Sequence, residues 1–263
     1  MNIAWHRIQA VILRSLYFER RNYVRMTEFF YWPLFDITIW GMTASWIEQT
    51  QNTSMKLVLL LMTGLVLWQV VLRASYEISI ALMEEMWSRS FINLFATPLN
   101  EVEWVIASML SGFFKMGLVL LFGGSVVALF YSLNVFAIGW YLLLFALLLM
   151  ASGWIIGFTA GSIIVLVGQR IGSLPWILGY FFAPFSGIFY PVQNLPVWAQ
   201  CISYSIPTTY IFEVMRIYIQ TNSLVWIMVG KAVLLNVVYL SLALTLFFMM
   251  FAKSRNRGLY RLE

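Results

Sequence analysis

The strongest constraint on this sequence is the absence of charge over stretches long enough to cross a lipid bilayer. From Val135 to Gly168 the chain contains no Asp, Glu, Lys or Arg, whereas a spanning helix needs only about 20 apolar residues. Charged residues make up 10% of the whole chain, against about 25% in soluble domains. The sequence therefore predicts an all-α integral membrane protein, because helices satisfy their backbone hydrogen bonds internally in lipid.

Apolar segments of this kind recur along the chain and predict six transmembrane helices, the fifth of them broken by prolines. The first is expected to hold Pro33 in its first turn, where proline is tolerated. The segment 135–168 is longer than one crossing needs, so we expect it to tilt, kink or project from the membrane. Within it, Gly153, Gly157 and Gly161 are spaced by four and predict a small-residue packing face. The expected spans are 29–47, a helix from 57 that continues beyond 72, 104–131, 135–168, 174–192 and 224–251.

The most charge-dense interruption in the middle of the chain is EEMWSRSFINLFATPLNEVE, residues 84–103. Its first half predicts an amphipathic helix over residues 84–97, because apolar side chains recur there at three- and four-residue spacing. Thr97 then predicts an N-cap and Pro98 the first position of the next helix. This extramembrane helix either ties two spans together at the lipid interface or docks a partner protein. The residues that would carry docking are Glu84, Glu85, Trp87, Arg89, Phe91, Leu94, Phe95, Thr97 and Pro98.

The start of the chain predicts a basic amphipathic helix within residues 1–25 that lies in the membrane surface. Arg7, Arg14 and Arg21 are spaced by seven and fall on one side of a helix, and Trp5 begins the opposing apolar side. The arginines would face anionic lipid headgroups or a cytoplasmic partner. A solvated basic arm is the alternative.

Charged residues inside the expected spans are costly and are therefore candidates for function. Asp36 either pairs with Arg25 or a neighbouring helix, or faces an aqueous path. Arg73 and Glu77 share a helical face and can neutralise each other. Lys115 lies near the middle of the third span and either pairs with an acid such as Asp36 or lines a cavity. The sequence leaves both a structural and a transport role open for these charges.

Residues 186–216 consist of short apolar pieces separated by Pro191, Pro196 and Pro207. Each piece is too short to cross a bilayer and too apolar for a free loop. Non-helical backbone at membrane depth needs cover from protein or a water-filled cavity. The pattern favours a re-entrant pair of half-helices that enters from the outer face, and a buried outer plug without a moving role is the alternative.

The distribution of basic residues predicts the orientation. Six spans place both termini on one side, and the basic N-terminal helix, Arg89, Arg170 and the basic tail from Lys253 fall on that side. The opposite loops carry few basic residues. The positive-inside bias then makes both termini and the helix of residues 84–97 cytoplasmic, and the proline-broken region external.

The residue types that most catalytic sites need are scarce. The single histidine, His6, and the single cysteine, Cys201, argue against a His-based metal or catalytic centre and against an internal disulfide framework. No G-x-x-x-x-G-K-[ST] motif occurs, so this chain cannot supply ATP chemistry itself. We expect no metal, no cofactor bound by this chain and no nucleic-acid partner.

With these features the chain resembles the membrane subunit of ABC exporters of the ABC-2 type. The resemblance covers nearly the whole chain and is most specific in SGIFYPVQNLPVWAQCISYSIPTTY. That family typically shows a Gly-x-x-Pro or Gly-x-x-x-Pro turn, a Leu-Pro-x-Trp, and a Pro-x-Thr-Tyr followed by an acid and an arginine. Many members also carry a glycine and a mid-helix glutamate in the cytoplasmic helix, where this chain has Arg89 and Ile92. The residues that the resemblance assigns to an outer gate are Gly187, Tyr190, Pro191, Pro196, Trp198, Pro207, Tyr210, Glu213 and Arg216.

The resemblance implies one transmembrane domain over residues 1–263 in a bacterial inner membrane. Two copies would pair as a homodimer among membrane lipids, and each helix of residues 84–97 would sit in a groove of a separate ATPase subunit that binds ATP and Mg. Closure of the ATPase would move that helix as a rigid lever, and the outer half-helices would gate the exit. The exported substrate would be lipid-linked, a glycan or a hydrophobic drug-like molecule.

Two other functions are alternatives to ATP-driven export. An ion-coupled secondary transporter would use Asp36, Lys115 and the Arg73/Glu77 pair as a relay. A membrane-embedded transferase would need His, Cys or paired acids clustered at one interface. His6 and Cys201 lie far apart in the sequence and on opposite expected faces.

Overall fold

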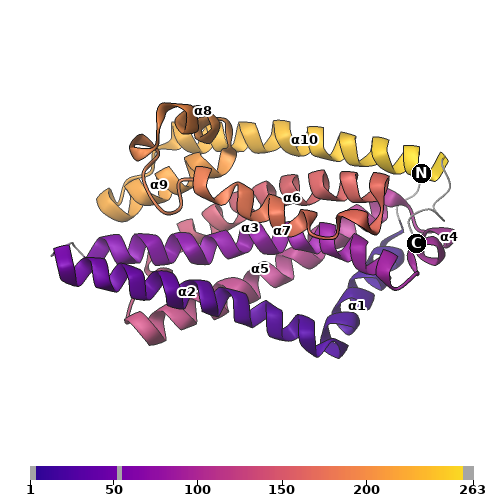
Figure 1. Cartoon of the computed structure of the whole chain (residues 1–263), viewed down its shortest axis with the longest axis horizontal. Coiled ribbons are helices and arrows are strands. Elements are labelled where there is room, and N and C mark those ends of the chain that lie inside the picture. The colour runs from indigo at the N-terminus through magenta and orange to yellow at the C-terminus, as the bar shows by residue number, and fades with distance from the viewer. Residues whose placement is uncertain (1–3, 52–54, 257–263) are drawn as a thin grey trace.

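The computed structural model describes residues 4–51 and 55–256, and every regular element in these ranges is helical. Figure 1 shows a bundle of long helices, which agrees with the predicted fold class. The α-helices are α1 (Trp5–Arg21), α2 (Tyr23–Gln51), α3 (Met55–Trp87), α4 (Phe91–Ala96), α5 (Glu101–Tyr131), α6 (Trp140–Val167), α7 (Leu174–Phe181), α8 (Val197–Ser205), α9 (Pro207–Thr221) and α10 (Trp226–Asn256). Short 3₁₀ turns lie between them, namely η1 (Val135–Ile138), η2 (Gln169–Ile171), η3 (Ala183–Phe185) and η4 (Val192–Asn194).

Four of the described helices are long and apolar enough to cross a membrane, namely Val58–Trp87, Glu101–Tyr131, Trp140–Val167 and Trp226–Asn256. Helix α2 is long enough but rich in Tyr, Trp and Thr, which lowers its hydropathy. The apolar segment Leu174–Phe185 is shorter than the hydrocarbon core at 1.5 Å per residue. The protein is therefore a multi-pass membrane protein, and crossings by α2 and by the 174–192 segment stay predictions.

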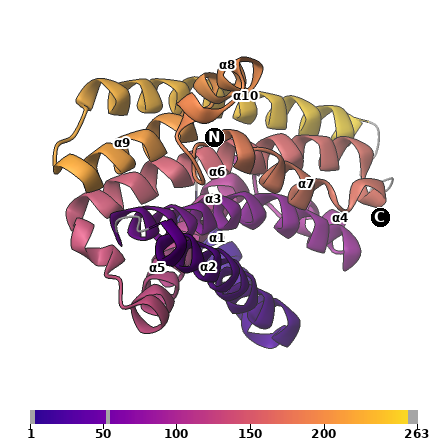
Figure 2. The same cartoon turned by 60° about the vertical axis from the view of Figure 1, so that its left-hand side comes forward.

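Helix α3 lies in the middle of the bundle, with α2, α5 and α6 packed around it (Figure 2). It is the most deeply buried of the four candidate spans, and α10 is the least buried. Large apolar side chains of α10 such as Leu234, Val237 and Leu242 are exposed. This side of α10 suits contact with lipid tails, because such side chains are stable there without a protein partner.

The predicted glycine face of α6 packs against α3. A Cβ atom on Gly153 would lie 2.5 Å from the backbone oxygen of Val71, and one on Gly157 would lie 2.8 Å from that of Ser75. Both distances are too short for a carbon–oxygen contact, so only glycine permits this approach of the two backbones. The prediction of a small-residue packing face is therefore confirmed.

The prediction of one continuous helix over residues 84–97 is wrong. Helix α3 extends to Trp87, a turn follows with Arg89 at a φ of 51°, and α4 begins only at Phe91. The predicted N-cap is also wrong, because Thr97 ends α4 and its hydroxyl donates to the Leu94 carbonyl at 2.6 Å. Asn100 caps α5 instead, since its side chain and that of Glu103 form a reciprocal capping box. Glu101 and Glu103 both lie in the first turn of α5.

The prediction that Pro33 lies in the first turn of its helix is wrong, because Pro33 lies well inside α2. The helix starts at Tyr23, six residues before the expected start of the first span. Apolar patterning marks where a helix enters lipid, and the helix itself extends into the more polar residues before that point. Two later prolines behave differently, because Pro175 and Pro207 each stand in the first turn of a helix.

The two ends of the bundle carry different elements. Figure 1 shows α4 and the end of α10 at one end, and α8 and α9 at the other. Helix α1 lies at the α4 end, where it packs against α5. The charge-dense stretch and the proline-broken region therefore lie at opposite ends of the molecule, as the sequence predicts.

Candidate functional site

The first candidate site is the connection from α3 through α4 to α5, residues 84–103, which we call the α3–α5 corner. Phe91 is fully buried there and its ring lies 6.2 Å from that of Phe251 in α10. Trp87 is half-exposed. The interpretation that the apolar residues of this stretch share one face is therefore wrong, because the turn at Arg89 rotates α4 relative to α3.

The exposed surface of the corner is formed mainly by the turn before α4 and the segment after it. Arg89, Thr97 and Pro98 are exposed, whereas Glu84 and Glu85 are half-buried. Leu94 is half-buried, and Phe95 belongs to α4 but its side chain lies outside the described part of the chain. The turn before α4 and the segment after it are thus the parts that a partner protein can reach.

Helix α1 is attached to this corner by polar contacts along its length. The Ala4 N–H donates to Glu103 Oε1 at 2.9 Å, and Arg7 Nη1 donates to the Pro98 carbonyl at 2.6 Å. Further along, Arg14 Nη2 lies 2.6 Å from Glu85 Oε2. The predicted basic side of this helix therefore faces the protein at Arg7 and Arg14 rather than lipid headgroups alone, because the corner supplies carboxylate and carbonyl acceptors.

The second candidate site lies between helices, where the predicted intramembrane charges gather. Lys115 Nζ forms ion pairs with both Glu77 of α3 and Glu19 of α1. Lys115 is 3% exposed and Glu77 is 5% exposed. Asp36, the acid proposed from sequence for Lys115, instead accepts a hydrogen bond from Gln69 Nε2 at 2.8 Å. The side chain of Arg25, the other partner proposed for Asp36, lies outside the described part of the chain.

Arg73 has a local role that the sequence analysis missed. Its Nη2 donates to the Phe29 carbonyl at 2.9 Å, and its guanidinium carbon lies 4.3 Å from the centre of the Phe29 ring. In a regular helix the Phe29 carbonyl would accept from the N–H of residue 33, which is a proline and has none. Arg73 thus satisfies the acceptor that Pro33 leaves open. The spacing of Pro33 four residues after Phe29 was the available signal.

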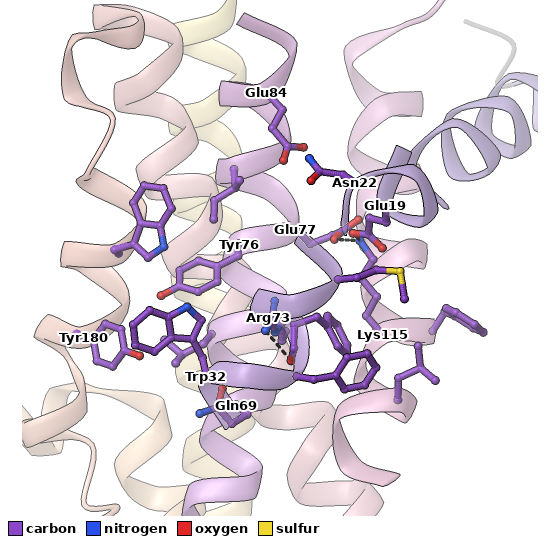
Figure 3. Close-up of a pocket in the computed structure, with 18 of the residues that line it drawn as sticks. Glu19, Asn22, Trp32, Gln69, Arg73, Tyr76, Glu77, Glu84, Lys115 and Tyr180 are labelled. Atoms are coloured by element: carbon purple, nitrogen blue, oxygen red, sulfur yellow. Dashed lines mark hydrogen bonds and ion pairs between the residues drawn. The ribbon is translucent and has the colours of Figure 1, made fainter. Parts of the chain in front are cut away.

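These charges surround a cavity of about 560 Å³ between α1, α2, α3, α5 and α7. Figure 3 shows Glu19, Glu77 and Lys115 together on one side, and Tyr76, Tyr180 and Trp32 on the other. Sequence reasoning identified the charges but not the aromatic wall. Trp176 and Tyr180, four residues apart, share a face of the short helix α7. The lining includes Glu19, Asn22, Phe29, Trp32, Gln69, Arg73, Tyr76, Glu77, Glu84, Trp87, Lys115, Trp176 and Tyr180.

The third candidate site is the region of residues 186–216, where two charged side chains of α9 contact backbone atoms of the preceding loop. Arg216 Nη1 lies 2.8 Å from Glu213 Oε1, three residues earlier on the same helix. Glu213 Oε1 also accepts from the Val192 N–H at 3.1 Å, and Arg216 Nη2 donates to the Gly187 carbonyl at 2.7 Å. Gly187 has a φ of 77°, a conformation that favours glycine.

Aromatic side chains complete this outer region. Tyr190 donates to the Pro184 carbonyl at 2.9 Å, and Tyr210 donates to the Tyr204 carbonyl at 3.0 Å. Trp198, after Pro196 at the start of α8, packs edge-on against the Phe185 ring. Pro191 begins the η4 turn. The residues that sequence motifs group together are thus brought into one compact region, which we call the outer clasp (residues 186–216).

Among residues 4–51 and 55–256, no cluster of three or more His, Cys, Asp or Glu side chains is arranged to hold a metal ion. Cys201 is exposed on α8. The corner offers a surface for docking, the cavity a space for a small molecule and the outer clasp a set of linked loops.

Comparison with known families connects the three sites. The family model for ABC-2 type transporters matches residues 9–219. That range begins within α1 and ends within α9, so it includes the corner, the cavity and the outer clasp. The comparison with curated proteins gives no match.

Proposed function

Because this chain belongs to the ABC-2 type transporter family, we propose that it is the permease subunit of an ATP-driven exporter and works as a homodimer with separate ATPase subunits. The membrane transport role follows from the family itself. Outward direction, pairing of two copies and location in a bacterial inner membrane belong to the proposal. ATP and Mg would be bound by the ATPase subunits.

The observation that carries the proposal is the set of contacts that ties the α3–α5 corner to the rest of the bundle. The corner is continuous with α3 and α5, Arg14 of α1 pairs with Glu85, and Arg255 of α10 lies 2.8 Å from Glu101. A force applied to the exposed turn at Arg89 would therefore reach four long elements at once. Packed helices transmit such a displacement as rigid bodies.

The proposed orientation places the corner in the cytoplasm. The turn between α3 and α4, the connection from α6 to α7 and the end of α10 all lie at the end of the bundle that carries α4, and they contain Arg89, Arg170 and Arg255. An excess of basic residues on one side marks the cytoplasmic side of bacterial membrane proteins. With α2 and the 174–192 segment counted as crossings, the chain has six spans and both termini on that side.

At the opposite end, the outer clasp would act as the exit gate. Glu213 and Arg216 of α9 hold the loop at Gly187 and Val192 through backbone contacts. Helices α8 and α9 would be the re-entrant half-helices, since neither is long enough to cross a bilayer alone. Movement of α9 would then open or close the loop without breaking the long spans.

Co-purification of an ATPase tests the proposal. Arg89→Glu reverses the charge of the exposed turn, whereas Arg170→Glu makes the same change at the same end but outside the corner. We expect the wild type and Arg170→Glu to recover an ATPase with a phosphate-binding loop motif from native membranes. Arg89→Glu should reduce that recovery at least about tenfold. The acidic ATPase groups that would face Arg89 in the proposed complex would then meet a carboxylate, and like charges across a docking surface are costly.

Substitution of the apolar residue Phe91 would not test docking. Phe91 is fully buried, so a polar side chain at this position would disturb the fold of the corner itself. Equal recovery with Arg89→Glu and Arg170→Glu would refute docking at the corner. Transport by the purified chain alone, abolished by an uncoupler, would refute the ATP-driven proposal and favour ion-coupled transport.

A further inference from the structure

Helix α2 consists of two segments, which Pro33 separates. We call residues 23–32 the proximal segment and residues 34–51 the distal segment. Among the described side chains of the proximal segment, only that of Phe29 is not exposed. The described side chains of this segment therefore lie mostly at the surface of the bundle.

The distal segment is fixed by its neighbours. Ile37 is fully buried, and Asp36 accepts a hydrogen bond from Gln69 of α3. Tyr131 of α5 donates to the Thr38 carbonyl at 3.1 Å. Because both α3 and α5 hold the distal segment, a displacement of α2 would be confined to the proximal segment.

The proximal segment forms one side of the cavity between α1, α2, α3, α5 and α7. This cavity of about 560 Å³ is lined from α2 by the proximal segment alone, because none of the described residues after Pro33 contributes to it. In Figure 3, Trp32 of this segment reaches the side of the cavity that carries Tyr76 and Tyr180. Displacement of the proximal segment would therefore change the width of the cavity. The lining residues that it supplies are Met26, Phe29, Phe30 and Trp32.

The backbone of α2 is weakened at the boundary between the two segments. Pro33 has no N–H to donate to the Phe29 carbonyl, and a proline ring crowds the carbonyl four residues before it. Sharp bends in helices occur mostly at such prolines. The proximal segment can therefore rotate about Pro33 while the hydrogen bonds within each segment stay intact.

Arg73 of α3 bridges this weak point from outside the helix. Its Nη2 donates to the Phe29 carbonyl at 2.9 Å, and its guanidinium carbon lies 4.3 Å from the centre of the Phe29 ring. A charged donor makes the stronger kind of hydrogen bond. A further contact joins Phe30 to Phe122 of α5, with ring centres 4.8 Å apart. Arg73 thus holds the proximal segment on α3 at the place where the helix lacks its own backbone bond.

Helix α1 connects the proximal segment to the α3–α5 corner. Only Asn22 separates α1 from α2, and its backbone is extended, with a φ of −99° and a ψ of 93°. Helix α1 contacts the corner through Arg7 and Arg14. A displacement of the corner would therefore reach the proximal segment through α1, and Pro33 is the point about which that segment would turn.

We propose that the proximal segment of α2 is a lid on the cavity, that it swings about Pro33, and that Arg73 is the latch that holds it closed. Arg73 is a positioning residue in this scheme, because it sets the place of the lid through its contacts with Phe29. The lid is distinct from the proposed exit gate, since it belongs to α2 and not to the outer clasp. The drive through the corner rests on the proposed function, whereas the hinge and the latch do not.

A double-variant cycle tests the latch. The purified full-length chain is placed in lipid nanodiscs, and hydrogen–deuterium exchange is measured for the backbone amides of both segments of α2. Arg73→Met should raise the exchange rate of the proximal segment by about tenfold, because a hydrogen bond from a charged donor is lost. In a Pro33→Ala background the same substitution should raise that rate by less than about twofold, since the new alanine N–H can donate to the Phe29 carbonyl. The cycle separates this contact from every other contact of Arg73.

Distances between spin labels test the swing. In a Cys201→Ser background, labels at Tyr23→Cys and Ile177→Cys connect the exposed start of α2 with an exposed position of α7. At about 1.5 Å of rise per residue, Tyr23 lies about 15 Å along the helix from Pro33, so a turn of about 20° displaces it by about 5 Å. Arg73→Met should add a population whose distance differs by at least about 5 Å, and Pro33→Ala should remove that population.

Two controls accompany these measurements. The label pair Met42→Cys and Ile177→Cys reports on the distal segment, because Met42 is exposed there, and its distances should not change. Lys231→Met removes a cation from an exposed position of α10 and should leave both exchange and distances at their wild-type values.

Three results would overturn the inference: exchange unchanged by Arg73→Met, an equal increase of exchange with and without Pro33→Ala, or the same displacement in both label pairs. The absence of any displaced population in the first label pair would do so as well. The assays contain no ATPase and no ATP. Their failure would therefore leave the exporter proposal standing, and failure of ATPase co-purification would leave the hinge and the latch standing.

Discussion

Lys115 shows how a buried charge is stabilised in this protein. Its ammonium group lies in the middle of α5, between Glu77 of α3 and Glu19 of α1. Removing any charged group from water costs several kcal/mol, so the site is stable only while the opposite charges accompany it. The same contact also attaches the end of α1 to the bundle, because Glu19 lies in the last turns of that helix.

Lys115→Met should destabilise the protein by about 3–5 kcal/mol, because the buried Glu77 and the half-buried Glu19 both lose their ion pair with this ammonium group. The double variant Lys115→Met/Glu77→Gln should recover part of that loss, since the buried side chain at position 77 is then neutral. The free energy of unfolding, measured by denaturant titration in detergent, tests both. Lys231→Met, at an exposed position of α10, is the control and should change stability little. A double variant no more stable than the single one would contradict this account.

At the scale of helices, the packing of α6 on α3 depends on the absence of side chains at three positions. Gly153 and Gly157 meet backbone atoms of α3, and Gly161 meets the Leu82 side chain. In lipid, helices associate through close packing and polar contacts rather than through the hydrophobic effect. The hydrogen bond from Ser152 Oγ to Asn236 Oδ1, at 2.8 Å, similarly joins α6 to α10.

Gly153→Ala should therefore destabilise the protein by about 1–3 kcal/mol, because its Cβ would force the two backbones apart. Gly117→Ala, in the interior of α5, provides the matched control, since a Cβ there meets nothing within 4 Å. That variant should be neutral or stabilising by up to about 1 kcal/mol, because alanine has the higher helix propensity. Thermal denaturation in detergent distinguishes the two, and equal stability of both variants would contradict close packing of α6 on α3.

At the scale of the whole molecule, the corner and the outer clasp lie at opposite ends of a bundle built around α3. The corner holds α1, α5 and α10 together through ion pairs, and the clasp holds α9 to the loop after η3. The cavity lies between these ends and closer to the corner, since its lining reaches Glu84 and Trp87. In the proposed exporter, a substrate would enter from the side of the corner and leave through the clasp.

The single cysteine allows a direct test of orientation. Cys201 is exposed on α8, so in spheroplasts a membrane-impermeant maleimide should label the wild type from outside. In a Cys201→Ser background, Ser88→Cys at the exposed turn of the corner should be labelled only after permeabilisation. Labelling of position 88 in intact spheroplasts would reverse the proposed topology and exclude a cytoplasmic docking site at the corner.

The family motifs were recognisable in the sequence because turns place strict demands on residue type. Gly187 needs a positive φ, and Pro207 begins a helix at its first turn. The Glu213–Arg216 pair follows from a spacing of three on one helix. Such short-range features depend on a few neighbouring residues, so a linear pattern contains enough information to predict them.

The sequence by itself determined that this protein is a bundle of apolar helices and that one helix has a glycine face, because both properties follow from local composition and helical periodicity. Only the tertiary structure decided that Lys115 pairs with Glu77 and Glu19, that Arg73 satisfies the carbonyl left open by Pro33, and that Trp176 and Tyr180 complete a cavity. Periodicity shows that a helix has a distinctive face, but the neighbour of that face depends on how distant helices pack.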